Sequence, residues 1–324
     1  MTEKWNVYVT RLLPDPAMDL LNQHCNVEVN PHDRVLTREE LLANVKGRDA
    51  VLCLLTDEID AKVLDAAQGA KIFANYAVGY NNVDVSAATD RGIIITNTPG
   101  VLTDTTADLA WALLFATARR VVEADSFLRA GRFKGWAPML FLGQDVSGKT
   151  LGIIGCGRIG SAFGKRAKGF DIKILYCDVV RNEEFEAETG AAYVDRETLL
   201  SESDFISIHV ALLPSTRHMI GENEFELMKE TAILVNTSRG PVVDETALVQ
   251  ALKEGRIWGA GLDVFEEEPE LAPGLAELDN VVIVPHIASA SIETRTKMGM
   301  MAVENILAVI DGKVPPNCVN PEVL

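Results

Sequence analysis

Residues 151–178, which read LGIIGCGRIGSAFGKRAKGFDIKILYCD, decide the fold predicted for this chain. A short apolar run, Leu151–Ile154, enters a glycine-rich turn, a helical segment follows, and a second apolar run ends on Asp178. The pattern G-x-G-x-x-G between a strand and a helix, with an acidic residue about 20 positions later, is typical of a dinucleotide-binding turn. We therefore predict a dinucleotide-binding unit here, whose turn contains Gly155, Gly157 and Gly160.

Each glycine of the turn has a separate task in this prediction. Gly155 allows a tight turn, Gly157 leaves room for a pyrophosphate, and Gly160 permits close packing of the helix on the strand. The helix N-terminus offers unpaired N–H groups and a positive dipole end to the phosphates. A carboxylate at Asp178 can accept hydrogen bonds from both ribose hydroxyls of the adenosine half and would repel a 2′-phosphate, so the sequence favours NAD over NADP.

The composition predicts a cytoplasmic enzyme of two domains. The chain has 324 residues, more than one average domain, and its alternating strand and helix patterns favour the α/β class with parallel sheets. A net charge of −17 disfavours nucleic acid or an anionic membrane as a partner. The five cysteines lack metal-ligand spacing, so we expect reduced thiols and no metal site. We see no signal peptide and no apolar stretch of about 18 residues.

The region before residue 100 reads as a separate α/β unit without a glycine-rich phosphate turn. Its loop 77–84, AVGYNNVD, directly follows a predicted strand. A glycine in such a loop lets backbone N–H groups approach an anion, but an ordinary turn with left-handed Asn residues fits the pattern as well. The strands expected in this unit are Trp5–Thr10, Val27–Asn30, Ala50–Leu55, Lys71–Tyr76 and Ile93–Thr96.

The segment Thr96–Gly100 breaks the pattern, and we interpret it as a crossing into the second domain. Beyond it, residues 103–129 are predicted to form one long helical stretch. The connection 131–148 then carries much apolar surface for a loop. Its side chains either fold back onto their own domain or contact a second subunit. We favour the second, because large exposed apolar patches usually mark interfaces.

Polar residues follow three of the later strands, at the point where each strand ends. Arg239 follows one strand, the carboxylates of residues 263–268 follow the next, and His286 follows the last. Because the carboxyl ends of parallel strands meet at one edge of a sheet, we expect these groups beside the Gly155 turn. The strands concerned belong to a set predicted at Asp204–Val210, Ala232–Thr237, Gly259–Phe265 and Val281–Val284.

Arg239, Glu268 and His286 form the set of groups that a hydride transfer to a 2-oxo acid requires. The planar guanidinium of an arginine binds a carboxylate in bidentate geometry. A histidine can donate a proton near neutral pH, and an adjacent carboxylate keeps the ring protonated and in place. Each of the three alone is more often a surface, turn or strand-end residue than a functional one, so it is their shared location that favours catalysis.

Four motifs in order complete the pattern: residues 155–160 (GCGRIG), 236–240 (NTSRG), 263–269 (DVFEEEP) and 285–289 (PHIAS). Together they resemble the D-isomer-specific 2-hydroxyacid dehydrogenase family across essentially the whole chain. The resemblance is closest to the hydroxypyruvate and glyoxylate reductases, through residues 77–84, 97–102 and 119–125.

The resemblance implies an α/β protein of two doubly wound parallel-sheet domains with a cleft between them. A flavodoxin-like substrate domain would comprise residues 1–100 and 291–324, and a Rossmann cofactor domain residues 101–290. The helix expected at 291–312 would return the chain to the first domain. Family members are homodimers held together by their cofactor domains, which agrees with the apolar loop 131–148.

The resemblance also implies a role for each site residue. Arg239, Glu268 and His286 would be catalytic, with His286 donating the proton, and the substrate would be hydroxypyruvate or glyoxylate. Val78 and Gly79 would donate backbone N–H bonds to the substrate carboxylate, and Ser289 would line the same pocket. Besides the glycines, the residues that would contact the cofactor are Arg158, Ile159, Asp178, Pro214, Thr237 and Asp263.

Several alternatives stay open at this point. Reductases of this type often use NADPH, and Arg181 could swing in to accept a 2′-phosphate, although we prefer NADH. A 3-phosphoglycerate dehydrogenase or a D-lactate-type enzyme would carry the same motifs, since they do not reveal the shape of the pocket. Transcriptional corepressors that sense NAD share the fold and resemble the family too.

Overall fold

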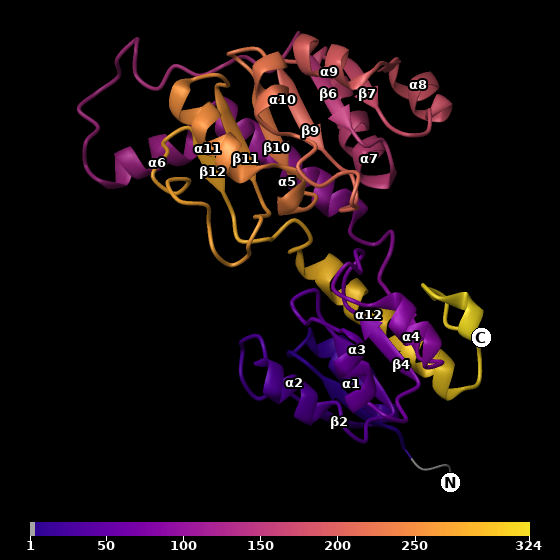
Figure 1. Ribbon diagram of the computed structural model, residues 1–324. Helices are drawn as coiled ribbons and strands as arrows, with labels where there is room; N and C mark the ends of the chain where they lie inside the picture. The colour runs from indigo at the N-terminus through magenta and orange to yellow at the C-terminus, as the bar shows by residue number, and fades with distance from the viewer. Residues whose placement is uncertain (1–3) are drawn as a thin grey trace. The chain divides into compact units, whose positions relative to one another are not determined.

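The computed structural model describes residues 4–324 and divides the chain into two compact units, each built on a parallel β-sheet (Figure 1). Unit 1 comprises Met1–Leu102 and Ser289–Leu324, and unit 2 comprises Thr103–Ala288. The predicted fold class, α/β with two parallel sheets, is confirmed.

The sheet of unit 1 has the strand order β2-β1-β3-β4-β5, which is the order of flavodoxin-like folds. Every residue of β3 (Ala50–Cys53) and β4 (Ile72–Asn75) is buried, because helices cover both faces of the sheet. These strands therefore read as unbroken apolar runs in the sequence. The remaining elements of the N-terminal part are β1 (Asn6–Val9), α1 (Asp15–His24), β2 (Asn26–Val29), α2 (Arg38–Asn44), α3 (Ala61–Ala66), α4 (Val85–Asp90) and β5 (Ile94–Thr96).

The long helix α12 (Ile292–Ile310) completes unit 1 from the far end of the sequence. Its N-cap is Ser291, whose hydroxyl accepts a hydrogen bond from the N–H of Thr294. The helix packs against α1 and β4, and the hydroxyl of Tyr76 donates to the carbonyl of Arg295 at 2.7 Å. Only a glycine fits at position 299, because a Cβ there would lie 2.7 Å from the Cβ of Ala17.

The sheet of unit 2 has seven strands in the order β12-β11-β10-β9-β6-β7-β8. Six of them follow the Rossmann order 3-2-1-4-5-6, and β12 extends the far edge. The short edge strand β8 (Ala192–Tyr193) was not predicted, because a two-residue strand leaves no apolar run. The other strands are β6 (Thr150–Ile154), β7 (Lys173–Cys177), β9 (Phe205–Ile208), β10 (Ile233–Asn236), β11 (Gly259–Leu262) and β12 (Val281–Ile283).

Helices cover both faces of this sheet (Figure 1). On one face α5 packs against α7, β10 and β11, and the indole of Trp111 donates to the carbonyl of Phe163 at 2.9 Å. The helices are α5 (Thr103–Ala118), α6 (Val121–Arg129), α7 (Arg158–Arg166), α8 (Glu183–Thr189), α9 (Arg196–Glu202), α10 (Glu222–Leu227) and α11 (Glu245–Glu254).

The single helical stretch predicted over 103–129 is wrong, because the chain breaks between α5 and α6. Arg120 adopts a left-handed conformation there, with φ of 53°. Its guanidinium binds the carboxylate of Glu123 in bidentate fashion at 2.7 and 2.9 Å and lies over the ring of Phe141, 5.1 Å from the centroid. These contacts stabilise a conformation that arginine rarely adopts.

The loop 131–148, called the arm below, extends away from the other elements of unit 2 in Figure 1. Phe141 packs edge-to-face on Phe127 of α6, with ring centroids 5.1 Å apart, so one side chain of the arm folds back. Trp136 and Met139 are 85% and 75% exposed. Among residues 4–324, no helix has the length and apolar character needed to cross a membrane.

Candidate active site

The glycine-rich turn follows β6 at the carboxyl edge of the unit 2 sheet. Gly155 has a φ of 89°, and a Cβ at Gly160 would lie 2.0 Å from the carbonyl oxygen of Gly155, so both positions require glycine. Gly157 is the N-cap of α7, and a Cβ there would meet no atom within 4 Å. The turn is therefore tight on its protein side and open above the helix N-terminus, which fits a pyrophosphate.

Two further features of unit 2 fit a dinucleotide. The hydroxyl oxygen of Thr237, just beyond β10, is buried and has no hydrogen-bond partner within residues 4–324. A buried hydroxyl without a partner is costly, and a bound polar group would satisfy it. Asp178 follows β7, and its carboxylate accepts from the N–H of Cys156 in the glycine turn at 2.6 Å. Arg158 and Ile159 begin α7, and Pro214 lies exposed in the connection after β9.

Arg181, the residue that could favour NADPH, is paired within its own segment. Its guanidinium contacts both carboxylate oxygens of Glu186, at 2.8 and 2.7 Å. Glu186 also accepts from the hydroxyl of Tyr176 at 2.6 Å. The hydrogen bond from Arg181, followed by that from Tyr176, lowers the pKa of Glu186 to about 2, so this carboxylate is charged at neutral pH.

The structure brings Glu268 and His286 together beside Arg239. The Nδ1 atom of His286 lies 2.8 Å from Oε2 of Glu268, and the other oxygen of Glu268 accepts from the N–H of Phe265 at 3.0 Å. The contact through Nδ1 leaves Nε2 of His286 available to another partner. Arg239 follows β10, and its guanidinium donates to the carbonyl of Ser238 at 2.7 Å.

Electrostatics maintain opposite charges in this set. Burial raises the pKa of Glu268, but the hydrogen bond and charge of His286, the Phe265 N–H and the charge of Arg239 together bring it below its ordinary value. Burial lowers the pKa of Arg239, and the charge of Glu268 opposes that effect. An arginine remains protonated at neutral pH in any case, so a fixed cation lies beside an ionised glutamate.

Asp263 positions the segment that carries His286. It is fully buried after β11, and its two oxygens accept from the N–H groups of Ile287 and Ala288, at 2.6 and 2.9 Å. Burial raises its pKa to about 6, and these two hydrogen bonds oppose the increase. Both oxygens of Asp263 are thus engaged by backbone, and its contact with a cofactor stays a prediction.

The residues around Glu268 include one that the sequence did not indicate. Glu245, the first residue of α11, is 4% exposed, and its carboxylate accepts from the N–H of Glu266 at 2.6 Å. A Cβ at Gly240 would lie 1.9 Å from the backbone of Phe265, so the Arg239 segment and this turn lie in direct contact. An acidic residue at a helix start is common, so position 245 gave no distinctive signal.

The predicted substrate residues Val78, Gly79 and Ser289 belong to unit 1. Val78 and Gly79 are half-buried in the connection after β4, and Ser289 precedes α12. Their roles stay predictions, as do those of the residues in unit 2.

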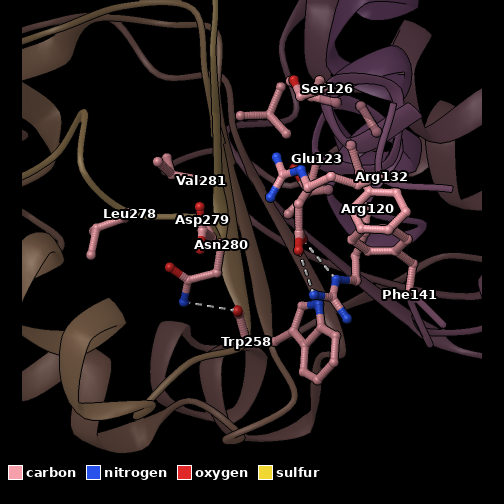
Figure 2. A pocket seen from close by; sticks show the side chains of 15 residues that line it. Arg120, Glu123, Ser126, Arg132, Phe141, Trp258, Leu278, Asp279, Asn280 and Val281 are labelled. Carbon is pink, nitrogen blue, oxygen red and sulfur yellow. Dashed lines mark hydrogen bonds and ion pairs between the residues drawn. The ribbon is translucent and has the colours of Figure 1, made fainter. Parts of the chain in front are cut away.

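Unit 2 contains a hollow of about 510 Å³ between α6 and β12, and Figure 2 shows the side chains that line it. Arg120, paired with Glu123, and the rings of Phe141 and Trp258 line it. None of the predicted catalytic, cofactor or substrate residues of the described chain contributes to its lining. This hollow is therefore separate from the predicted site residues, and residues of the arm form part of its lining.

Fold and site together define a class, an oxidoreductase built on a dinucleotide-binding domain. Residues 111–288 match the protein-family model described as "D-isomer specific 2-hydroxyacid dehydrogenase, NAD binding domain". The chain belongs to the D-isomer specific 2-hydroxyacid dehydrogenase family, as its motifs predicted.

Relatives match along nearly the full length of the chain. A glyoxylate reductase of Korarchaeum cryptofilum is 55% identical, covering 99% of this chain and 97% of its own. A glyoxylate reductase of Thermococcus litoralis is 54% identical, covering 99% and 98%. The crystal structure of an NADPH-dependent glyoxylate/hydroxypyruvate reductase from Sinorhizobium meliloti, in complex with NADP and malonate, is similar with a TM-score of 0.87 and 31% identity, covering 99% and 98%.

Proposed function

We propose that this protein reduces glyoxylate to glycolate and hydroxypyruvate to D-glycerate, with NADH as the preferred cofactor. The observation that carries the proposal is the 2.8 Å contact between His286 and Glu268 beside Arg239. This arrangement supplies a proton donor (His286), a carboxylate that holds the donor (Glu268) and a cation for an acidic substrate (Arg239). All three residues follow strands whose carboxyl ends lie at the same edge of the sheet as the glycine turn. The names of the relatives at 50–55% identity support glyoxylate, and the name of the Sinorhizobium meliloti relative at 31% identity includes both substrates.

In the proposed mechanism, each charged residue has one task. Arg239 binds the substrate carboxylate and orients the adjacent carbonyl. NADH, when bound, supplies the hydride. Nε2 of His286 gives its proton to the carbonyl oxygen as negative charge develops there, and Glu268 stabilises the imidazolium before the transfer. Burial of Arg239 strengthens its attraction for the substrate carboxylate.

The remaining site residues bind the two small molecules. Val78 and Gly79 donate backbone N–H bonds to the substrate carboxylate, and Ser289 lines its pocket. The glycine turn and the N-terminus of α7 hold the pyrophosphate, and the hydroxyl of Thr237 meets a polar group of the cofactor. The full set of proposed cofactor contacts is Gly155, Gly157, Arg158, Ile159, Gly160, Asp178, Pro214, Thr237 and Asp263.

The preference for NADH rests on Asp178 and Glu186. The carboxylate of Asp178 favours ribose hydroxyls and repels a 2′-phosphate. Glu186 holds Arg181 in a bidentate pair, so the guanidinium that could accept a 2′-phosphate is already engaged. NADPH is used less efficiently in this proposal, although the Sinorhizobium meliloti relative is NADPH-dependent.

The protein is proposed to act as a homodimer that uses the arm of unit 2. Trp136 and Met139 expose large apolar side chains that a second subunit would cover. The cytoplasmic location stays a prediction from the sequence.

The test is oxidation of NADH and NADPH, followed by nicotinamide absorbance, with glyoxylate, hydroxypyruvate, pyruvate and 3-phosphohydroxypyruvate in parallel. We expect fast NADH turnover with hydroxypyruvate and measurable turnover with glyoxylate. Faster turnover of pyruvate or of the phosphorylated acid would replace the proposal with a lactate-type or phosphoglycerate-type activity. Absence of turnover with all four would favour a cofactor-sensing protein.

A further inference from the structure

The backbone of residues 77–80, called the anion loop below, is held from one side by three hydrogen bonds. The carbonyl of Ala77 accepts from the N–H of Thr98 at 2.9 Å. The carbonyl of Val78 accepts from the side-chain amide of Asn97 at 2.7 Å. The carbonyl of Gly79 accepts from the side-chain amide of Asn75 at 2.9 Å. Three successive peptide groups therefore have their oxygens fixed.

Fixing a carbonyl also fixes the following N–H. In a trans peptide the oxygen of one residue and the N–H of the next point in opposite directions. The N–H groups of Val78, Gly79 and Tyr80 consequently point away from Thr98, Asn97 and Asn75. Val78 and Gly79 are half-buried and Tyr80 is 43% exposed, so the loop lies partly at the surface of unit 1.

The two asparagines occupy neighbouring strand ends. Asn75 is the last residue of β4 and fully buried, and Asn97 follows β5, which pairs with β4. The side-chain amide of Asn82 donates to Oδ1 of Asn75 at 3.5 Å. The same amide also donates to the carbonyls of Leu54 and Asp57. The anchors of the loop thus belong to the rigid edge of the sheet.

We infer that Asn97 and Asn75 are positioning residues that orient the peptide groups of the anion loop for binding the substrate carboxylate. This inference rests on the proposed function, because it assigns the loop to the carboxylate of the same substrate. Backbone donors held before the ligand arrives need no reorganisation on binding, which favours affinity. The anion loop accordingly recognises only the carboxylate of the substrate, and other residues recognise the remainder of the molecule.

Asn97→Leu is the decisive variant, because Asn97 is half-buried and leucine has the same branching at Cγ without a donor. We expect KM for glyoxylate to rise about tenfold, kcat to change by less than about threefold, and the Kd for oxalate, measured by calorimetry, to rise about tenfold. Asn97→Asp lacks the amide donor and should lose as much. Asn97→Gln keeps an amide and should recover part of the loss.

Thr96→Val is the matched control. Thr96 is fully buried at the end of β5, and its hydroxyl has no hydrogen-bond partner in the part of the chain that the structure describes. The substitution preserves volume at the same sheet edge and should change neither KM nor oxalate binding. A second comparison uses glycolaldehyde, which lacks the carboxylate, and its kcat/KM should be the same in Asn97→Leu as in the unchanged protein.

The outcomes separate the inference from the function on which it rests. If the unchanged protein reduces neither glyoxylate nor hydroxypyruvate, the proposed function is wrong, and the oxalate titration alone decides the inference. Equal oxalate affinity in Asn97→Leu and the unchanged protein would overturn the inference, as would an unchanged protein that binds no oxalate. An equal loss of kcat/KM for glyoxylate and for glycolaldehyde in Asn97→Leu would also overturn the inference, since it would indicate general damage to the protein.

Discussion

His286 lies in a left-handed backbone conformation, with φ of 52°, although it is not a glycine. Its N–H donates to the carbonyls of Asp263 and Val284, and the carboxylate of Asp263 binds the next two N–H groups. Such a conformation costs about 1–2 kcal/mol for an ordinary residue. The buried carboxylate of Asp263 offsets this cost and directs the imidazole to Glu268.

Substitutions of His286 and Arg239 should impair different steps. His286→Ala removes the proton donor, so kcat should fall about 10²- to 10⁴-fold while the KM for hydroxypyruvate changes little. Arg239→Ala removes the cation, so KM should rise strongly with a smaller effect on kcat. Steady-state kinetics of both variants measure the difference, with NADH affinity as the control. Equal losses in the two constants for both variants would contradict these roles.

His209, just beyond β9, should make the fold sensitive to mild acid. Its Nε2 lies 2.9 Å from the hydroxyl of Ser207, its ring lies 5.1 Å from that of Phe163, and burial lowers its pKa to about 3. Because the unfolded chain binds this proton near pH 6.5 and the folded chain does not, the free energy of unfolding falls as pH drops below 6.5. The loss reaches about 2 kcal/mol by pH 5.

The variant His209→Gln keeps a side chain that can bind Ser207 but does not titrate. Urea unfolding at pH 7.5 and pH 5 should show a smaller loss of stability than in the unchanged protein. The exposed His32→Gln provides the control, with the full loss retained. The same loss in all three proteins would show that His209 is not responsible.

At the scale of elements, we expect the segment from β7 to α8 to determine which cofactor is preferred. Glu186→Gln removes the charge that holds Arg181 but keeps an acceptor for Tyr176. The freed guanidinium should raise kcat/KM for NADPH about fivefold and leave that for NADH within about twofold. The double variant Arg181→Ala/Glu186→Gln should lose this gain. NADPH activity that does not respond to Glu186→Gln would place cofactor selection elsewhere.

The sequence predicts well those elements whose structure depends on residues close to one another along the chain. Strands such as β3 and β10 are buried at every position and appear as apolar runs. The glycines of the turn are required by the positive φ of Gly155 and by the contact between Gly160 and Gly155, both of which are local. The break at Arg120 depends on Phe141 about 20 residues later, which local patterns do not reveal. Local patterns do not reveal the role of Asn97 either, because its partner is the carbonyl of Val78, 19 residues earlier in the loop after β4.

At the scale of the whole molecule, the arm should determine assembly. Trp136→Asp places a charge on the most exposed large apolar side chain of the arm, so it should raise the Kd of a dimer at least about 100-fold. Lys134→Asp introduces the same residue at a polar position two places earlier and should have little effect. Sedimentation velocity over a range of concentrations measures both. An unchanged protein that sediments as a monomer at micromolar concentration would exclude the proposed dimer.

The return of α12 to unit 1 has a consequence for synthesis on the ribosome. Unit 2 is one uninterrupted stretch, so it can fold as soon as Ala288 has left the exit tunnel. The first 102 residues emerge earlier but still lack α12. They also lack Asn320, whose side chain hydrogen-bonds the backbone of Ile93, just before β5, and of Ile95 within it. The part of the protein made first is therefore the last to complete its fold. Until α12 is made, one side of its sheet is uncovered and exposed to association with other nascent chains.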